Sequence, residues 1–170
     1  MFENEVSLSN TATVSYGWST KNLQPKISQP QRKRERKTIF GAVNPHTGDL
    51  IQRVEDKGNT LSFFRFLCSC VNRNEGKKVY MILDNVRFHH AKRLQPILEK
   101  YKNRIELVFL PPYSPDLNPI ERVWWLMRKQ VTHNRWVKSM KQRVEDFDSW
   151  CRNINKIQII SVCNLIVNIY

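Results

Sequence analysis

The chain has 170 residues, and 28 Lys and Arg against 15 Asp and Glu give a formal net charge of +13, which favours a polyanion, above all nucleic acid, as the partner. Hydrophobic residues make up 41% and aromatic residues 11%, which excludes a disordered chain and suits one domain with a real core. Every apolar run is shorter than the roughly 18 to 20 residues of a membrane span, and the first 20 residues lack the basic start of a signal peptide, so we expect no membrane association.

The first third of the chain has the composition of β-structure. Residues 2–14 are short, alternating and β-branched, which predicts a strand and leaves open a turn into a second one. The polar, proline-containing residues 19–30 predict a loop, and a dense basic run follows it. Residues 38–43 and 50–54 flank a turn with proline and glycine, so we expect them to pair as an antiparallel hairpin.

The middle of the chain alternates between helical and strand patterns. Residues 60–72 predict an amphipathic helix with Leu61, Phe64, Leu67, Cys68 and Val71 on its apolar face. Residues 79–83 are continuously apolar between charged neighbours, which predicts a central strand buried on both faces. A helix through residues 94–101, with Pro96 as a kink or in the first turn, leads to another apolar strand at 105–110. This order implies a parallel pair with a right-handed crossover.

The last third predicts helices. Asn118 is suited to be an N-cap, Pro119 fits the first helical position, and an apolar stripe continues to Val131. A further helix covers roughly residues 139–152. After Lys156 the chain carries no charge and shows no clear period, which leaves a buried strand or an aggregation-prone segment open for residues 157–170.

The four cysteines form neither a paired C-x-x-C zinc pattern nor a disulfide framework. We therefore expect free, mostly buried thiols and a reducing, cytoplasmic location.

Two acidic residues stand at the ends of predicted elements. Asp84 ends the apolar strand, at the edge where open α/β sheets bind ligands, although Asp is also common as a cap. Glu121 falls three residues after Asn118, and this spacing alone favours a capping box. Taken together, two carboxylates converging beside a basic surface would hold Mg²⁺ against phosphate.

Two longer motifs resemble transposases of the mariner-like superfamily, in particular its bacterial insertion-sequence branch. Residues 84–89 match the D-N-x-x-x-H signature, and residues 110–121 match the P-x-S-P-D-L-N-P-I-E block, which Trp124 extends as E-x-x-W. The basic run and residues 40–44 are also similar to that branch. The resemblance spans roughly residues 2–155.

The resemblance implies an α/β, RNase H-like fold, with a mixed five-stranded sheet and helices on both faces. It also implies metal-dependent DNA cleavage and strand transfer, in which two aspartates and a glutamate hold two Mg²⁺ or Mn²⁺ ions. Asp84 takes the place of the second acid and Glu121 that of the third, so both are expected metal ligands. Asn4 takes the place of the first acid.

Asn4 offers a neutral oxygen and removes one negative charge from a site that must hold two divalent ions. Glu3 and Glu5 are no substitute, because neighbours in a strand point to the opposite face. We therefore expect this copy to be catalytically impaired. The alternative is a non-catalytic, DNA-binding remnant that pairs with or inhibits intact transposase. A basic structural or RNA-binding protein would require both motifs to be coincidental.

The positive charge is expected to contact DNA phosphates. The candidate residues lie in the basic run and on the helix that carries the third acid: Arg32, Lys33, Arg34, Arg36, Lys37, Arg122, Arg128 and Lys129. His89 is either a residue at the rim of the active site or a satisfied surface histidine. The tryptophans at 124, 125, 136 and 150 are expected in the core or its cover rather than as platforms for bases.

The family implies helix-turn-helix domains before the catalytic domain. This chain begins almost directly at its first predicted strand, so we expect a catalytic domain at residues 1–155 with the helix-turn-helix region absent, and an atypical apolar tail at 156–170. The expected partners are DNA and either a second copy of the chain or an intact transposase.

Overall fold

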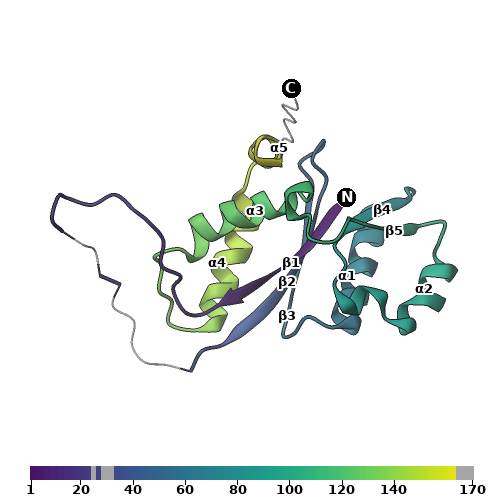
Figure 1. Ribbon diagram of the computed structural model, residues 1–170, viewed down its shortest axis with the longest axis horizontal. Helices are drawn as coiled ribbons and strands as arrows, with labels where there is room; N and C mark the ends of the chain where they lie inside the picture. The colour runs from purple at the N-terminus through teal and green to yellow at the C-terminus, as the bar shows by residue number, and fades with distance from the viewer. Residues whose placement is uncertain (24–25, 28–32, 164–170) are drawn as a thin grey trace.

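The computed structural model describes residues 1–23, 26–27 and 33–163. One five-stranded sheet with the order β3-β2-β1-β4-β5 organises this part of the chain (Figure 1). Its strands are β1 (Phe2–Ser9), β2 (Arg36–Val43), β3 (Leu50–Glu55), β4 (Val79–Leu83) and β5 (Ile105–Phe109). β2 is antiparallel to both β1 and β3, whereas β4 is parallel to β1 and β5, so the predicted mixed sheet is confirmed.

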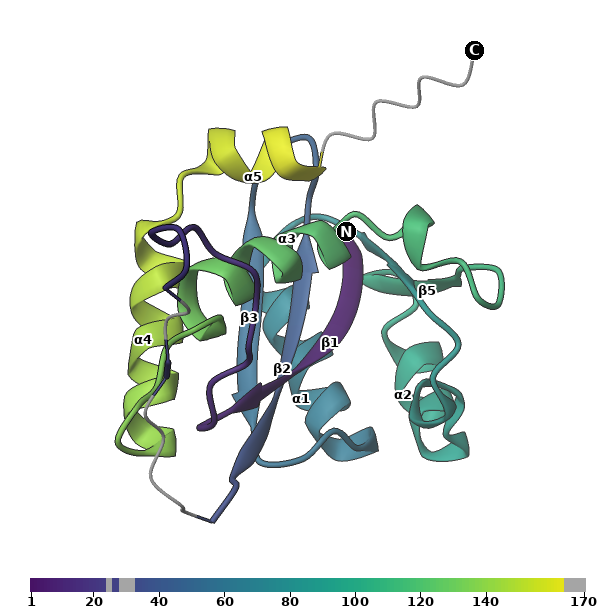
Figure 2. The ribbon, with the colours of Figure 1, turned by 60° about the vertical axis from the view of Figure 1, so that its left-hand side comes forward.

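Helices cover both faces of this sheet (Figures 1 and 2). α3 (Ile120–Met127), α4 (Met140–Asn153) and α5 (Lys156–Cys163) pack against one face. α1 (Thr60–Arg73) and the short α2 (Gln95–Lys100) lie on the other. The sheet therefore separates two apolar cores, and the predicted arrangement of helices on both faces is confirmed.

β1 divides its side chains between these two cores. Val6 and Leu8 are buried in the core under α3 and α4. Because side chains alternate along a strand, Asn4 lies on this same face, and Glu3 and Glu5 face the other. This alternation decides which polar residues of β1 can meet the acids that follow β4 and begin α3.

The close packing of α3 on the sheet requires a glycine in β2. Gly41 pairs with Asn4 across the sheet, and a Cβ atom at this position would collide with the fully buried ring of Trp124. The absence of a side chain thus lets α3 approach the middle of the sheet directly beside Asn4.

Some local predictions were wrong for reasons of tertiary packing. β4 is not buried on both faces, since Tyr80 is 51% exposed. Of the predicted apolar face of α1, Leu67 is buried and Phe64 and Val71 pack against the core, but Leu61 is 56% exposed and Cys68 is also exposed. The fully buried positions are instead Phe63, Phe66 and Cys70. The helix presents a stripe one position away from the predicted one, because Phe rings at 63 and 66 fill the space over β2.

The end of the chain also differs from expectation. Residues 10–14 form no second strand and make only an isolated bridge, between Thr13 and His133. Residues 156–163 form a helix rather than a strand, and Ile159 and Cys163 bury it against α3. Residues 164–170 lie outside the described residues.

All four cysteines are free, as predicted, but burial is complete only for Cys70 and Cys163. Burial raises the pKa of Cys151 to about 12 and that of Cys163 to about 11, which keeps both thiols protonated. Of the helices in the described residues, none combines the length and the apolar character needed to cross a membrane.

Candidate active site

The register of two parallel strands brings Asn4 and Asp84 together. Phe2 of β1 pairs with Ile82 of β4, which places Asn4 level with the residue that follows the end of β4. Asp84 is held there by a tight turn in which its Oδ1 accepts from the Val86 amide at 3.3 Å. Its side chain stays 45% exposed, so the carboxylate remains accessible from solvent.

Glu121 reaches the same place from α3. Asn118, which precedes the helix, is buried and donates from Nδ2 to the Glu3 carbonyl at 2.7 Å. This bond fastens the start of α3 to the backbone of β1 next to Asn4. Asn118 is therefore not the predicted N-cap, and no side chain caps α3 at all. The capping-box interpretation of Glu121 is wrong, because its carboxylate is used elsewhere.

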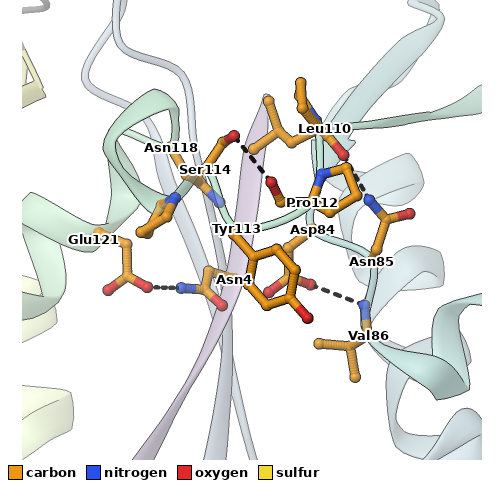
Figure 3. Close-up of a pocket in the computed structure, with 12 residues that line it drawn as sticks. Asn4, Asp84, Asn85, Val86, Leu110, Pro112, Tyr113, Ser114, Asn118 and Glu121 are labelled. Carbon is orange, nitrogen blue, oxygen red and sulfur yellow. Dashed lines mark hydrogen bonds between the residues drawn. The ribbon is translucent and has the colours of Figure 1, made fainter.

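The Glu121 carboxylate accepts a short hydrogen bond from Asn4. The Asn4 Nδ2 group donates to Glu121 Oε1 (Figure 3). The Asn4 Oδ1 atom accepts from the Glu5 amide at 2.7 Å. The amide thus turns its NH₂ group, rather than an oxygen, toward Glu121. The donor set that remains for a divalent cation consists of the carboxylates of Asp84 and Glu121, which are oxygen ligands of the kind that Mg²⁺ and Mn²⁺ prefer.

These three residues line one surface cavity of about 420 Å³ (Figure 3). The proline-rich segment that follows β5 forms its other wall, with Tyr113 fully exposed. Asn85 donates to the Leu110 carbonyl at 2.6 Å and so joins the turn after β4 to the turn after β5. Convergence of Asn4, Asp84 and Glu121 is the arrangement that the sequence motifs implied.

His89 is not the surface histidine of one interpretation, and it adjoins the site from behind Asp84, with its Nδ1 atom 3.6 Å from the Asp84 carboxylate. It is neither at the surface nor part of the cavity, since it is 1% exposed and lies beneath β1, on the face opposite Asn4. There it contacts Glu5 through Nε2 at 2.9 Å and the Asp84 carbonyl through Nδ1 at 3.2 Å. Sequence reasoning identified Glu3 and Glu5 only as residues facing away from the site, and it missed their meeting with His89.

Burial makes Glu3 an unusual acid. Its side chain is fully buried, and this burial, together with the charges of Glu5 and Asp84, raises its pKa well above the ordinary value of 4.5. The sequence signal was a pair of acids at alternate positions of the first predicted strand.

The predicted DNA contacts fall into two groups. Lys33, Arg34 and Arg36 are exposed, and Lys37 pairs with Asp56 at the start of β2; Arg32 lies outside the described residues. Because Arg36 pairs with Ser9, this group lies five residues, or about 16 Å, along β1 from Asn4. In the second group, on α3 and the π-helical turn after it, Arg122 and Lys129 are exposed and Arg128 is partly exposed.

The tryptophans mostly follow the predicted role. Trp124 and Trp150 are buried, while Trp125 is 56% exposed with the Lys129 ammonium 5.0 Å above its ring.

Comparison with known proteins places this site in context. Residues 1–143 match the family model described as DDE superfamily endonuclease. The uncharacterized protein y4pE/y4sA of Sinorhizobium fredii (strain NBRC 101917 / NGR234) is 36% identical over 102 residues, which are 59% of this chain and 71% of that protein. The insertion element IS630 uncharacterized 39 kDa protein of Shigella sonnei is 25% identical over 146 residues, 83% of this chain but 41% of that protein.

Solved structures share the fold. The Mos1 transposase paired-end complex with left transposon end matches with a TM-score of 0.72 and 13% identity. The mariner Mos1 paired end complex with Mg matches with the same TM-score and 15% identity. Each likeness covers 95% of this chain and 50% of the other. The predicted RNase H-like fold is thereby confirmed, and the chain spans about half of these Mos1 chains.

Proposed function

Because the chain belongs to the family of DDE superfamily endonucleases, we propose that it is the catalytic region of an insertion-sequence transposase, in which Asn4 weakens DNA cleavage and strand transfer. The observation that carries this proposal is the convergence of Asn4, Asp84 and Glu121 at one open cavity. The similarity of the chain to the insertion element protein of Shigella sonnei supports the same proposal.

Asp84 and Glu121 are the residues that would hold a divalent cation, Mg²⁺ or Mn²⁺. Both carry carboxylates at the cavity, and the Mos1 complex with Mg, which shares the fold, supports this choice of metal. When bound, such ions activate the attacking water or 3′-hydroxyl and stabilise the leaving oxygen of the phosphodiester. The open side of the cavity leaves room for a DNA strand to reach the two carboxylates.

Asn4 lowers the negative charge of the site. With aspartate at this position the three side chains would carry a formal charge of −3, and with asparagine they carry −2, against +4 for two divalent ions. The Asn4 NH₂ group also occupies an oxygen of Glu121 that would otherwise be free for a cation. The lower negative charge and the hydrogen bond to Glu121 both weaken metal binding at the position where an aspartate would supply a ligand.

The test is Asn4→Asp, assayed by strand cleavage of plasmid or oligonucleotide DNA with Mg²⁺ or Mn²⁺. Even groups that only support a metal ligand typically contribute 10–100-fold to affinity or activity, so restoring a direct ligand should raise cleavage by about 100-fold or more. The double variant Asn4→Asp/Asp84→Asn is the matched control and should lose this gain. Equal, robust cleavage by the original chain and by Asn4→Asp would refute the impairment.

A second candidate function is a non-catalytic DNA-binding remnant, which pairs with intact transposase. The specific observation that favours it is the hydrogen bond from Asn4 to Glu121, which links the two side chains without a cation. Calorimetric titration with Mg²⁺ or Mn²⁺ separates the two functions. If Asp84→Ala leaves this affinity unchanged, the remnant function is correct; if the affinity falls, the enzyme function stands.

DNA is the proposed partner in both cases. The exposed residues Lys33, Arg34 and Arg36 near the end of β1, and the basic residues Arg122, Arg128 and Lys129 on α3 and the turn after it, would contact phosphates of DNA that reaches the cavity. Such contacts release counterions, so DNA affinity should fall steeply with salt. They position DNA without reading its sequence.

A further inference from the structure

The strongest unexplained feature lies behind the cavity, on the opposite face of β1. The side chain of Glu3 is completely buried, and within the described residues neither of its carboxylate oxygens has a hydrogen-bond partner. An unpaired carboxyl group in a dry interior is costly, so such groups are normally matched by a hydrogen bond, a charge or a metal ion. The buried Glu3 carboxylate would therefore be stabilised by a cation bound next to it.

His89 brings a second potential metal ligand, its Nε2 atom, next to Glu3. Its Nδ1 atom lies 3.2 Å from the Asp84 carbonyl oxygen and 3.6 Å from the Asp84 carboxylate, and both of these oxygens can only accept. Nδ1 is therefore the ring nitrogen that carries hydrogen. Nε2 lies 2.9 Å from Glu5 Oε1, a hydrogen-bond distance at which one proton stands between the two atoms, and 3.8 Å from Glu3 Oε2. A metal ion bound here would replace that proton and accept the electron pair of Nε2.

A histidine that binds a metal commonly donates from its other ring nitrogen to a backbone carbonyl or a carboxylate, as Nδ1 of His89 does to the Asp84 carbonyl. One ligand atom each from Glu3, Glu5 and His89 lie within 4.8 Å of one another. Metal–ligand distances near 2.05 Å at a tetrahedral angle require ligand atoms about 3.3 Å apart. The distances of 2.9 and 3.8 Å from Nε2 to the two carboxylates lie on either side of this value.

We propose that Glu3, Glu5 and His89 form a binding site for one divalent transition-metal ion of the Zn²⁺ class, separate from the catalytic cavity. Imidazole nitrogen selects zinc and its neighbours over Mg²⁺, which takes oxygen ligands. The rings of Phe63 and Phe88 lie 4.2 and 4.6 Å from the His89 ring and make the surroundings apolar. A bound ion would supply the positive partner that Glu3 lacks.

The role of this ion is structural. It joins the middle of the sheet, through Glu3 and Glu5, to the turn after β4, through His89. The other nitrogen of His89 contacts the carbonyl of Asp84, so the ion would also fix the backbone that carries this cavity residue. The inference uses residues on the far side of β1 from Asn4 and does not depend on the proposed function.

The experiment is titration of the metal-free full chain with Zn²⁺, followed by calorimetry and thermal unfolding without DNA. We expect one tightly bound Zn²⁺ per chain and a melting temperature several degrees higher. Glu3→Gln and Glu5→Gln, which keep the shape of each side chain, should each weaken this binding by at least about 100-fold. Glu121→Gln, at the cavity, and Cys68→Ser, at the exposed thiol, should leave it unchanged.

Two outcomes would overturn the site. One is a Zn²⁺ affinity of Glu3→Gln within threefold of the original chain, and the other is loss of binding in Glu121→Gln alone, which would place the ion in the cavity. Should the glutamine variants fail to fold, the visible spectrum of the Co²⁺-loaded original chain decides. Absorption bands of a nitrogen–oxygen Co²⁺ site that disappear when Zn²⁺ is added support the proposal. Their absence overturns it and leaves the proton between Glu5 and His89 as the only occupant of the site.

Discussion

The two faces of β1 use polar residues in opposite ways. On one face, Asn4 meets Glu121 at the wall of an open cavity, where Asp84 is 45% exposed. On the other, the Glu3 side chain is fully buried between β1 and His89. The residues are consecutive in the chain, yet one face is open to a substrate and the other is closed to water.

This difference keeps Glu3 and Glu5 away from the cavity, although both are neighbours of Asn4 in the chain. Because side chains of neighbouring residues leave a strand in opposite directions, Glu3 and Glu5 would have to cross the sheet to reach Asp84 and Glu121 in the cavity. A carboxylate one position away in sequence is thus separated from the cavity by the thickness of the sheet. Under the proposed function, the negative charge that Asn4 does not carry is therefore not supplied by Glu3 or Glu5.

The largest effect on the cavity face should come from Trp124→Ala. Trp124 is fully buried against Gly41, and the loss of such a ring leaves a void next to Asn4. We expect the free energy of unfolding to fall by about 3–5 kcal/mol, measured by urea denaturation. Trp125→Ala removes the same side chain one position further on, where it is 56% exposed, and should cost less than about 1 kcal/mol. Similar losses for both variants would contradict the packing of α3.

A smaller loss of stability is expected from Asn118→Ala. This variant removes the hydrogen bond that joins the start of α3 to the backbone of β1. The Asn118 amide group satisfies the buried Glu3 carbonyl and fastens α3 beside Asn4. Removal leaves that carbonyl without its donor, so unfolding should become easier by about 1–3 kcal/mol. In the Asn4→Asp background, cleavage should fall as well, since Glu121 is then no longer held in place. Unchanged stability and unchanged cleavage would refute this role.

The smallest expected effect is the change of folding stability with pH that Glu3 causes. It is measured with a chelator present, so that the chain is free of metal. Since burial raises the pKa of Glu3 above 4.5, the folded chain holds a proton that the unfolded chain releases. The stability from this proton is complete below about pH 4.5 and is lost as the pH rises through the folded-state pKa, by at most about 1.4 kcal/mol per pH unit. Glu3→Gln lacks this term, so its stability relative to the original chain should increase from pH 4 to pH 8. Parallel pH profiles would show that Glu3 is ionised when buried.

Local sequence patterns predicted those helices and strands well whose position depends on a few neighbouring residues. The continuous apolar run at 79–83 gave β4 with its observed bounds, and the turn with Gly48 gave the β2–β3 hairpin. Ser139 was correctly placed at the start of α4, where its hydroxyl caps the Gln142 amide. In each case the signal is contained within a few neighbouring residues.

Predictions failed where a distant partner competes with a local one. The spacing of Asn118 and Glu121 satisfied the rule for a capping box, but both side chains bond to β1 instead. The apolar stripe of α1 was misplaced because the position of the phenylalanines over β2 is a property of two elements together.

The sequence by itself indicated the composition of the candidate site, because its motifs contain Asp84 and Glu121 and the resemblance assigns Asn4 to the position of the first acid. It also determined that Glu3 and Glu5 face away from Asn4, because alternation follows from the backbone of any strand. Only the tertiary structure decided what those two residues meet. His89 is 84 positions from Glu5, and it reaches Glu5 only because β4 lies beside β1 in the sheet and the chain turns beneath it.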